Sequence, residues 1–369
     1  MTGTRREFIK AAAIAAGVSA TGLPLVGEAG QRDTANGPLS ILILGGTGFI
    51  GPHMVREALR RGHAVTLFNR GRTNAGLFPD IETIKGDRDG GLDGLKGRRW
   101  DAVIDNSGYV PRVVQDSARL LSPNCDRYVF ISTISVYRDV LGAGDEDSPL
   151  ATIADETIEE ITGETYGALK ALCEQRVVSE IGDDRQTILR PTFICGPGDH
   201  TDRLTYWPVR TRRGGKMLWP GTPADAIQVV DVRDLANFTI DCVDRAIGGT
   251  YNVANPPQSY SMGQLLEDCR AVTASDVEPV WVPQDFLASK DLNPGAQFPV
   301  WTGSQTFLSH SSDRALAAGF HHRPERETIR DLMSWWDTLP GERTNQLRAG
   351  PDAGNEAGAI AAFLPPQDA

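Results

Sequence analysis

A phenol and an ammonium group placed four residues apart suggest acid–base chemistry on an alcohol. Tyr166 and Lys170 would share one face of a helix in the run Tyr166-Gly167-Ala168-Leu169-Lys170. A free tyrosine has a pKa of about 10 and is a poor base at neutral pH, so it needs a neighbouring positive charge. Thr133 ends an expected strand over 127–133, and its hydroxyl could orient a substrate alcohol. The alternative is that Tyr166 and Lys170 are simply exposed helical residues.

A glycine-rich turn lies between two expected strands near the start of the chain. Residues 40–44 are almost wholly apolar, as expected for a strand buried on both faces of a parallel sheet. The turn over 45–51 follows, then a helical segment at 53–62 and a second strand at 64–68. This order, strand–turn–helix–strand, is the context that a dinucleotide-binding turn requires.

The glycines of this turn have separable roles. Gly45 would allow the tight turn, Gly48 would let the backbone approach a pyrophosphate, and Gly51 would let helix and strand pack closely. The helix N-terminus offers amides and a partial positive charge to the phosphates. The whole turn is therefore predicted to contact a nicotinamide dinucleotide, through Gly45, Thr47, Gly48, Phe49, Ile50 and Gly51.

The end of the second strand bears on the choice of cofactor. A site that prefers NAD usually has Asp or Glu here, where it bonds the ribose hydroxyls. This chain has Asn69-Arg70-Gly71-Arg72 instead. Because two guanidinium groups could hold a 2′-phosphate, Asn69, Arg70 and Arg72 favour NADP over NAD. The alternative is that both arginines are solvated loop charges.

Three more expected strands complete an alternating pattern. They cover 82–85, 100–107 and 127–133, and helical stretches separate them. The alternation predicts an α/β fold with a doubly wound parallel sheet. Three further cofactor contacts are expected where these strands end, at Asp87, Asn106 and Ser107.

Several motifs together resemble a known family. They are Gly45-x-x-Gly48-x-x-Gly51, Ser132-Thr133-Ile134-Ser135-Val136-Tyr137, Tyr166-x-x-x-Lys170, and the runs over 190–199 and 227–236. Their types and order are similar to those of the extended short-chain dehydrogenase/reductases, the NAD-dependent epimerase/dehydratases. The resemblance covers about residues 40 to 340. Arg138 and Cys195 depart from the usual pattern, where Gly and often Tyr stand.

The resemblance implies a Rossmann-type sheet with a smaller C-terminal substrate lobe. It implies that Tyr166 is the general acid/base, that Lys170 holds the nicotinamide ribose and lowers the pKa of the tyrosine, and that Thr133 bonds the reacting hydroxyl. The expected activity is hydride transfer to or from a secondary alcohol or carbonyl of a sugar-like small molecule. Epimerase, dehydratase and dehydrogenase remain open, and so does a homodimer.

The alternative from another class is a non-catalytic NAD(P)-binding scaffold or regulator, RNA-associated in some relatives. The composition speaks against a dedicated nucleic-acid binder, since 37 basic and 48 acidic residues leave a formal charge of −11. The five cysteines are widely spaced without Cys-x-x-Cys, so neither a disulfide framework nor a metal site is expected. No apolar run is long enough for a permanent membrane span.

The first residues have the layout of an export signal. Arg5-Arg6 precede Phe-Ile-Lys and an Ala-rich stretch, which resembles a twin-arginine signal over 1–29. This predicts use of the twin-arginine export machinery and a periplasmic location. The alternative is a frayed helix that stays attached to a cytoplasmic protein. Residues 30–38 are expected to be a polar linker.

The remaining chain is expected to form three parts: a nucleotide-binding domain over 39–190, a mixed lobe over 191–340 that includes returning Rossmann elements, and a loosely ordered tail over 341–369 with a short docking helix at 359–364. The acidic segment 145–164 is expected to be a solvated loop and short helix, with a lid as the alternative.

Some polar residues of the lobe are candidates for substrate contacts. A basic group could bind an anionic substrate or form a solvated helix face; it comprises Arg203, Arg210, Arg212, Arg213 and Lys216. His200 could line a pocket or lie on the surface. His321-His322 is expected to be structural, and Trp335-Trp336 should pack into the core from a helix over 327–339.

Overall fold

The computed structural model describes residues 37–140, 142–303 and 309–364. The expected export signal over 1–29, and all of the linker except its last two residues, lie outside these ranges. Among the helices that are described, none is long and apolar enough to cross a membrane.

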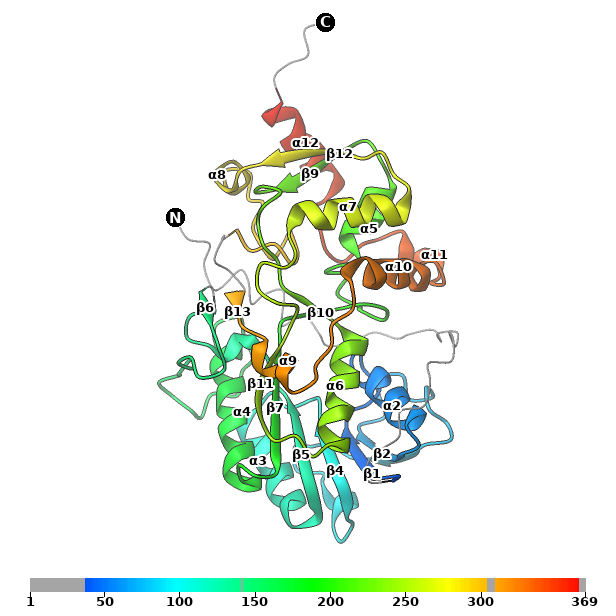
Figure 1. The fold of residues 1–369 in the computed structure, drawn as a ribbon, viewed down its shortest axis with the longest axis vertical. Coiled ribbons are helices and arrows are strands. Elements are labelled where there is room, and N and C mark those ends of the chain that lie inside the picture. Colours follow the sequence, from blue (N-terminus) through cyan, green and yellow to red (C-terminus); the bar gives the residue numbers. More distant parts are fainter. Residues whose placement is uncertain (1–36, 141, 304–308, 365–369) are drawn as a thin grey trace, which may run out of the picture.

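A parallel sheet of seven strands forms one half of the molecule (Figure 1). Its order is β11-β7-β5-β4-β1-β2-β3, and every neighbouring pair is parallel. The predicted doubly wound α/β fold is therefore confirmed. The strands are β1 (Ser40–Leu44), β2 (Ala64–Asn69), β3 (Glu82–Lys85), β4 (Trp100–Asp105), β5 (Cys125–Ile131), β7 (Gln186–Pro191) and β11 (Gly249–Val253).

Helices cover both faces of this sheet, which explains why central strands such as β1 are apolar on both faces, whereas the edge strand β3 is polar and mostly exposed. Ile41 and Ile43 of β1 pack with α2 and α6, whereas Leu42 and Leu44 pack with α3 and α4. Alternate side chains thus enter two separate cores. The four helices are α2 (Gly51–Arg60), α6 (Val232–Asp244), α3 (Pro111–Leu121) and α4 (Tyr166–Ile181).

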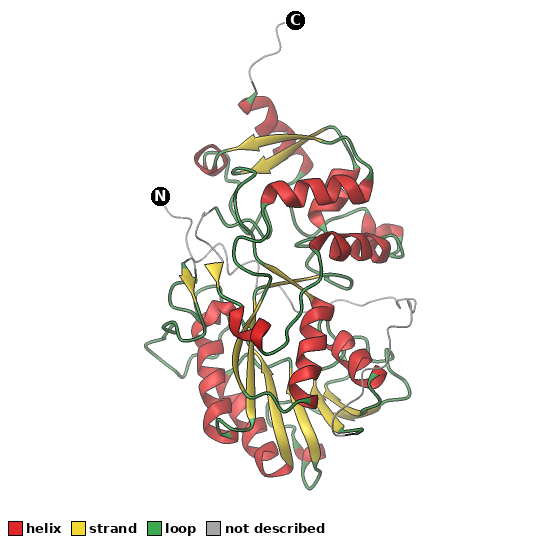
Figure 2. Cartoon of the chain, viewed as in Figure 1, coloured by secondary structure: helices red, strands yellow, loops and turns green. Residues whose placement is uncertain are grey.

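A second lobe stands at one end of the sheet and is built of helices and short strand pairs (Figures 1 and 2). Its core holds four large indoles, those of Trp207, Trp219, Trp301 and Trp336. The strand pairs are β8 (Phe193–Cys195) with β10 (Val229–Asp231), and β9 (Lys216–Pro220) with β12 (Glu278–Val282). The helices are α5 (Tyr206–Arg212), α7 (Met262–Thr273), α8 (Gln284–Ala288), α10 (Glu325–Trp336), α11 (Gly341–Thr344) and α12 (Ala353–Phe363).

The chain crosses between the two halves more than once. After Pro191 it returns to the sheet through α6, β11 and α9 (Asp313–Ala317), which packs on β11. A short parallel pair, β6 (Ala143–Gly144) with β13 (Ser309–His310), lies beside the sheet. Three short 3-10 turns cover Asp93–Leu95, Ser122–Asn124 and Ile134–Val136.

The region after residue 340 differs from the loose tail that the sequence predicts. It contains α11 and α12, and α12 is longer than the expected helix at 359–364. Glu356 of α12 is buried, where it accepts hydrogen bonds from the backbone N of Leu218 at 3.0 Å and from Nε of Arg210 at 2.8 Å. The expectation of a loose tail is wrong over these helices, because a buried charge pair fixes the Ala- and Gly-rich segment.

Two other predictions concern segment 145–164 and the Trp335-Trp336 pair. Segment 145–164 is a loop, mostly exposed, without the expected short helix. Glu146 is an exception, since its carboxylate is buried and accepts from the backbone N of Asn252 at 2.8 Å. Trp336 is buried and Trp335 packs partly against the same core, as predicted.

Candidate active site

One helix and one strand end bring the three predicted catalytic residues together. Tyr166 is the first residue of α4, and Lys170 lies one turn further along it. The hydroxyl of Tyr166 lies close enough to the Thr133 side chain for this neighbour to lower the pKa of the phenol. Nζ of Lys170 donates to the carbonyl of Ile131, the last residue of β5, at 2.8 Å, and to that of Gly108 at 2.7 Å. The ammonium thus joins the ends of β4 and β5, where Thr133 lies.

Burial dominates the electrostatics of this cluster. It raises the pKa of Tyr166 above its ordinary value, and the Thr133 side chain and the charge of Arg203 act in the opposite direction. Burial also lowers the pKa of Lys170 to about 8. The expected lowering of the tyrosine's pKa is therefore wrong for the chain without cofactor, because desolvation outweighs the neighbouring charge.

The glycine-rich turn has the backbone that its sequence predicts. Gly45 has a φ of +112°, and a Cβ there would lie 2.3 Å from Oδ1 of Asn106. A Cβ on Gly51 would lie 2.5 Å from the Cα of Gly46, so only glycine permits this packing. A Cβ on Gly48 would meet nothing within 4 Å and would enter open space. The turn therefore leaves Gly48 accessible, as close approach of a pyrophosphate requires.

The remaining residues of the turn are held by the segment after β2. Asn69 donates to the carbonyl of Gly45 at 3.0 Å and accepts from the backbone N of Gly71 at 2.9 Å. Asn74 donates to the carbonyl of Thr47 at 2.9 Å. Asn69 is thus a structural link between β2 and the turn. Contact with a 2′ group of the cofactor would then fall to the residues that follow it.

Arg70 and Arg72 are both exposed beyond the end of β2. Within the described ranges of the chain, neither guanidinium has an ion-pair partner. Both are therefore available for a phosphate at this position.

Asn106 and Ser107 follow β4 directly and lie against the turn. The Ser107 hydroxyl donates to the carbonyl of Leu44 at 3.0 Å, and Asn106 lies close to Gly45. Asp87 follows β3, is exposed, and accepts from the backbone N of Asp89 at 3.2 Å. Asp87, Asn106 and Ser107 thus border the same end of the sheet as the glycine-rich turn, close to the ends of β1 to β4.

A buried network behind the catalytic cluster was missed by the sequence reasoning. The Ser132 hydroxyl donates to Glu174 at 2.5 Å, and Glu174 forms an ion pair with Arg190 at 2.6 Å. Arg190 also donates to the Tyr137 hydroxyl at 3.0 Å. Because Glu174 lies one turn beyond Lys170, this network fixes α4 against β5 and β7. The spacing of Lys170 and Glu174 on one helix face was the available signal.

A loop from the second lobe lies against the glycine-rich turn. Nε2 of His53 is 2.9 Å from the carbonyl of Pro197, and burial lowers the pKa of His53 to about 4. The rings of Phe49 and His200 meet edge to face with centroids 6.2 Å apart. His200 therefore lies against Phe49 of the glycine-rich turn.

The structure divides the predicted basic group. Arg203 lies near Tyr166, with its guanidinium 5.6 Å from the ring centre of Phe193. Arg210 is bound to Glu356, and Arg212 pairs with Asp337 at 2.7 Å. Arg213 and Lys216 line a hollow of about 800 Å³ between α5 and α12. Only Arg203 of this group is close to the catalytic cluster.

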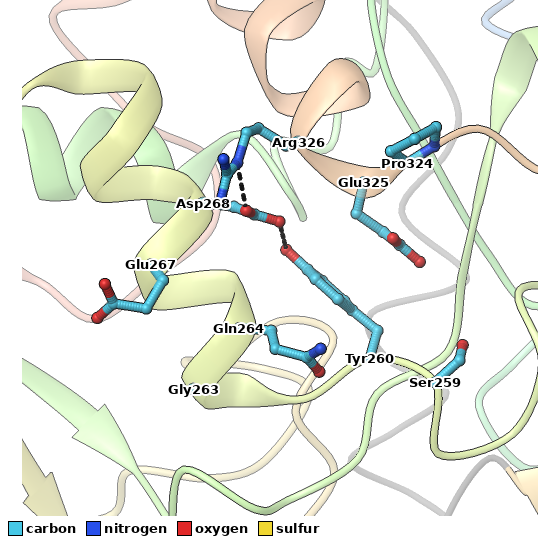
Figure 3. A pocket seen from close by; sticks show the side chains of 9 residues that line it. All are labelled: Ser259, Tyr260, Gly263, Gln264, Glu267, Asp268, Pro324, Glu325 and Arg326. Carbon is cyan, nitrogen blue, oxygen red and sulfur yellow. Dashed lines mark hydrogen bonds and ion pairs between the residues drawn. The ribbon is translucent and has the colours of Figure 1, made fainter.

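A second hollow of about 500 Å³ lies in the lobe between α7 and α10 (Figure 3). Asp268 stands at its wall, bonded to the Tyr260 hydroxyl at 2.8 Å and to Nε of Arg326 at 2.7 Å. Tyr166 is not among the residues that line this hollow. In the ranges that the structure covers, no cluster of three or more His, Cys, Asp or Glu side chains could hold a metal ion. All five cysteines are free and buried.

Curated relatives of this chain include proteins of different activity. It is 27% identical over 241 residues to the chloroplast stem-loop binding protein of 41 kDa b of Arabidopsis thaliana, covering 60% of each chain. It is 30% identical over 223 residues to a 2-alkyl-3-oxoalkanoate reductase of Stenotrophomonas maltophilia, covering 54% of this chain and 64% of the relative. The chain thus matches less than two thirds of the length of these relatives.

Solved structures share the fold at lower identity. A UDP-glucose 4-epimerase superposes with a TM-score of 0.57 at 20% identity, over 82% of this chain and 98% of the other. The Bordetella bronchiseptica enzyme WbmH, solved with NAD+, gives a TM-score of 0.59 at 19% identity, over 82% and 99%.

The family assignment rests on residues 41–254, which match the model of the NAD dependent epimerase/dehydratase family. This segment contains the glycine-rich turn, Thr133, Tyr166 and Lys170, and it includes six strands of the sheet besides most of β1. Use of a cofactor of the NAD(P) type follows from this match. The chain belongs to the NAD dependent epimerase/dehydratase family.

Proposed function

We propose that this protein is an NAD(P)-dependent oxidoreductase or epimerase that transfers hydride to or from a secondary alcohol or carbonyl of a sugar-like small molecule. One observation carries the proposal. The Tyr166 hydroxyl lies beside the Thr133 side chain, while Lys170, on the same helix, joins the ends of β4 and β5. A phenol, a hydroxyl and an ammonium group are thus gathered beside the glycine-rich turn.

Each of the three groups has a distinct part. The bound nicotinamide supplies the hydride donor or acceptor. Thr133 holds the oxygen of the substrate, and the Tyr166 hydroxyl gives it a proton during reduction or takes one during oxidation. The raised pKa of Tyr166 keeps the phenol protonated at neutral pH, which suits the reductive direction. Two N–H groups of Lys170 donate to backbone carbonyls, and the third remains for a ribose hydroxyl.

The cofactor preference within this proposal is NADP. Exposed Arg70 and Arg72 support it, because two guanidinium groups that form no ion pair with another described residue suit a 2′-phosphate. Export through the twin-arginine route over residues 1–29 also belongs to the proposal. It favours a free sugar or another small carbonyl compound over a nucleotide sugar.

Two relatives support reduction or oxidation of a carbonyl compound as the reaction. One is the 2-alkyl-3-oxoalkanoate reductase, and the other is a 3-beta-hydroxysteroid dehydrogenase of Mycolicibacterium neoaurum, 27% identical over 188 residues. A structural neighbour was solved with UDP-glucose and NAD. A first substrate panel therefore comprises a free sugar, a 3-oxoalkanoate, a 3β-hydroxysteroid and UDP-glucose.

Tyr166→Phe tests the mechanism. It should leave NADP binding unchanged and lower turnover by about 10²- to 10⁴-fold, the usual contribution of a positioned acid or base. Calorimetric titration with NADP+ and the absorbance of reduced nicotinamide measure the two quantities. Tyr251→Phe is the matched control, because Tyr251 bonds only the carbonyl of Gly248. Undiminished turnover in Tyr166→Phe would contradict proton transfer by the Tyr166 hydroxyl.

A non-catalytic scaffold is the second candidate, and the similarity to the stem-loop binding protein supports it. The formal charge of −11 disfavours it, because phosphate repels an acidic surface. Titration of the wild type with a stem-loop RNA distinguishes the two. RNA binding together with absent turnover on the whole panel would favour the scaffold.

A further inference from the structure

The loop between β8 and α5 reaches the glycine-rich turn and carries polar groups that the proposed mechanism does not use. Its Pro197 carbonyl contacts His53, and a Cβ on Gly198 would lie 3.6 Å from Phe49. His200 meets Phe49 from the same side. The loop therefore covers the glycine-rich turn, where a substrate beside the nicotinamide would touch it.

Arg203 at the end of this loop differs from the deeply buried arginines of the fold. Arg61, Arg88 and Arg190 each form ion pairs with carboxylates at 2.9 Å or less. Arg203 is half-buried, yet it forms no ion pair within the described residues. Its Nε donates to the Thr201 hydroxyl at 2.9 Å, and one Nη makes a long contact of 3.4 Å with the carbonyl of Ile194. Most of its donors are therefore uncommitted.

Two further groups of the loop are buried without partners. Oδ1 of Asp199 accepts from the backbone N and hydroxyl of Thr201 at 2.9 and 2.6 Å. Oδ2 of Asp199 and Nε2 of His200 have no hydrogen-bond partner within the described chain, and Asp199 is completely buried. Buried polar groups without partners cost free energy, so such a cluster beside a catalytic phenol calls for a ligand.

We propose that Arg203 binds an anionic substituent of the substrate, a carboxylate or phosphate, next to the carbon that exchanges hydride. Asp199 and His200 then bond hydroxyl groups of the same molecule. The inference rests on the proposed function and narrows it, because it selects hydroxy or oxo acids and sugar phosphates over neutral sugars and steroids. A guanidinium group suits both anions, since its N–H groups form parallel hydrogen bonds with two oxygens.

The test compares anionic and neutral members of matched pairs. One pair is a 3-oxo acid and its methyl ester, and the other is glucose 6-phosphate and glucose. Binding to the NADP+-loaded protein is measured by calorimetry and turnover by nicotinamide absorbance. The wild type should prefer the anionic member of one pair by about 10- to 100-fold, as charge-assisted hydrogen bonds allow. The preferred pair tells carboxylate from phosphate.

Variants test whether Arg203 causes the preference for the anionic member of a pair. Arg203→Met should abolish it while leaving the neutral member unchanged, and Arg203→Lys should retain part of it. Arg213→Met is the matched control, an exposed arginine of the same lobe. Thermal unfolding checks that each variant is folded.

Three results would overturn the inference: equal binding of both members by the wild type, full preference in Arg203→Met, or loss of preference in Arg213→Met. None of these depends on Tyr166. Because calorimetry needs no turnover, failure of the catalytic mechanism in the Tyr166→Phe test remains a separate outcome.

Discussion

The sheet half and the C-terminal lobe are stabilised in different ways. In the sheet half, apolar strands form two continuous cores against helices on either face. The lobe has only two-stranded pairs, and its core is built around large indoles. Its last segment is fixed by buried charges, such as Asp202, which bonds Arg343 and the backbone N of Arg348. Regular periodicity organises one half, and pairings distant in sequence organise the other.

The comparison teaches where substrate recognition can vary. The predicted cofactor positions near the glycine-rich turn lie at strand ends, which the sheet fixes by register. The loop carrying His200, Asp202 and Arg203 is instead fixed from outside, because Arg348 also donates to the carbonyl of His200 at 3.0 Å. The C-terminal segment thus supports the loop that covers the crevice.

The two halves should differ most in the free energy of unfolding that is lost when one buried ion pair in each half is broken. Arg190→Met leaves the buried Glu174 carboxylate without its cation, with only the neutral Ser132 hydroxyl as a described partner, and should lower the free energy of unfolding by about 3–5 kcal/mol. Arg343→Met should cost about 1–3 kcal/mol, since Asp202 keeps its backbone partner. Arg112→Met, at an exposed pair, is the control and should show no measurable change. Urea unfolding measures all three. Equal losses for Arg190→Met and Arg343→Met would contradict the contrast drawn here.

The buried ammonium of the sheet half predicts a pH effect. The pKa of Lys170 is about 8 in the folded chain against an ordinary value of 10.5. Between these values the unfolded chain binds more protons, so this group makes the free energy of unfolding rise with pH, and its burial penalty is fully present below pH 8.

Lys170→Met should remove this rise, whereas Lys216→Met in the lobe should keep it. Affinity for NADP should also weaken as the pH passes upward through about 8, because the ribose loses a charged donor. Denaturant unfolding and cofactor titration across the pH range test both effects. An identical pH profile for the wild type and Lys170→Met would refute the assignment.

Glycine substitutions in the turn distinguish contact with the cofactor from packing within the fold, and their expected effects are smaller. Gly48→Ala should weaken NADP binding by about tenfold with little change in thermal stability, because its Cβ enters space that only a pyrophosphate would fill. Gly76→Ala, where a Cβ also meets nothing, should alter neither quantity. Gly51→Ala should destabilise the fold itself, since its Cβ would lie 2.5 Å from Gly46. Unchanged affinity in Gly48→Ala would place the pyrophosphate elsewhere.

Sequence alone determined the sheet half. The apolar runs, the glycine spacing and the four-residue step from Tyr166 to Lys170 are local patterns, and they predicted the strands, the turn and the shared helix face. The lobe could not be predicted in this way, because Glu356 with Arg210 and Asp202 with Arg343 are pairs more than a hundred residues apart.

Only the tertiary structure decided the pKa shifts of the site residues and the position of the loop between β8 and α5. Tyr166 and Lys170 have shifted pKa values because the whole fold removes water from them, which no spacing reveals. Arg203 was one of five similar basic residues in the sequence. The packing of its loop against the glycine-rich turn distinguishes it, because its guanidinium acts on Tyr166 and forms no ion pair with another described residue.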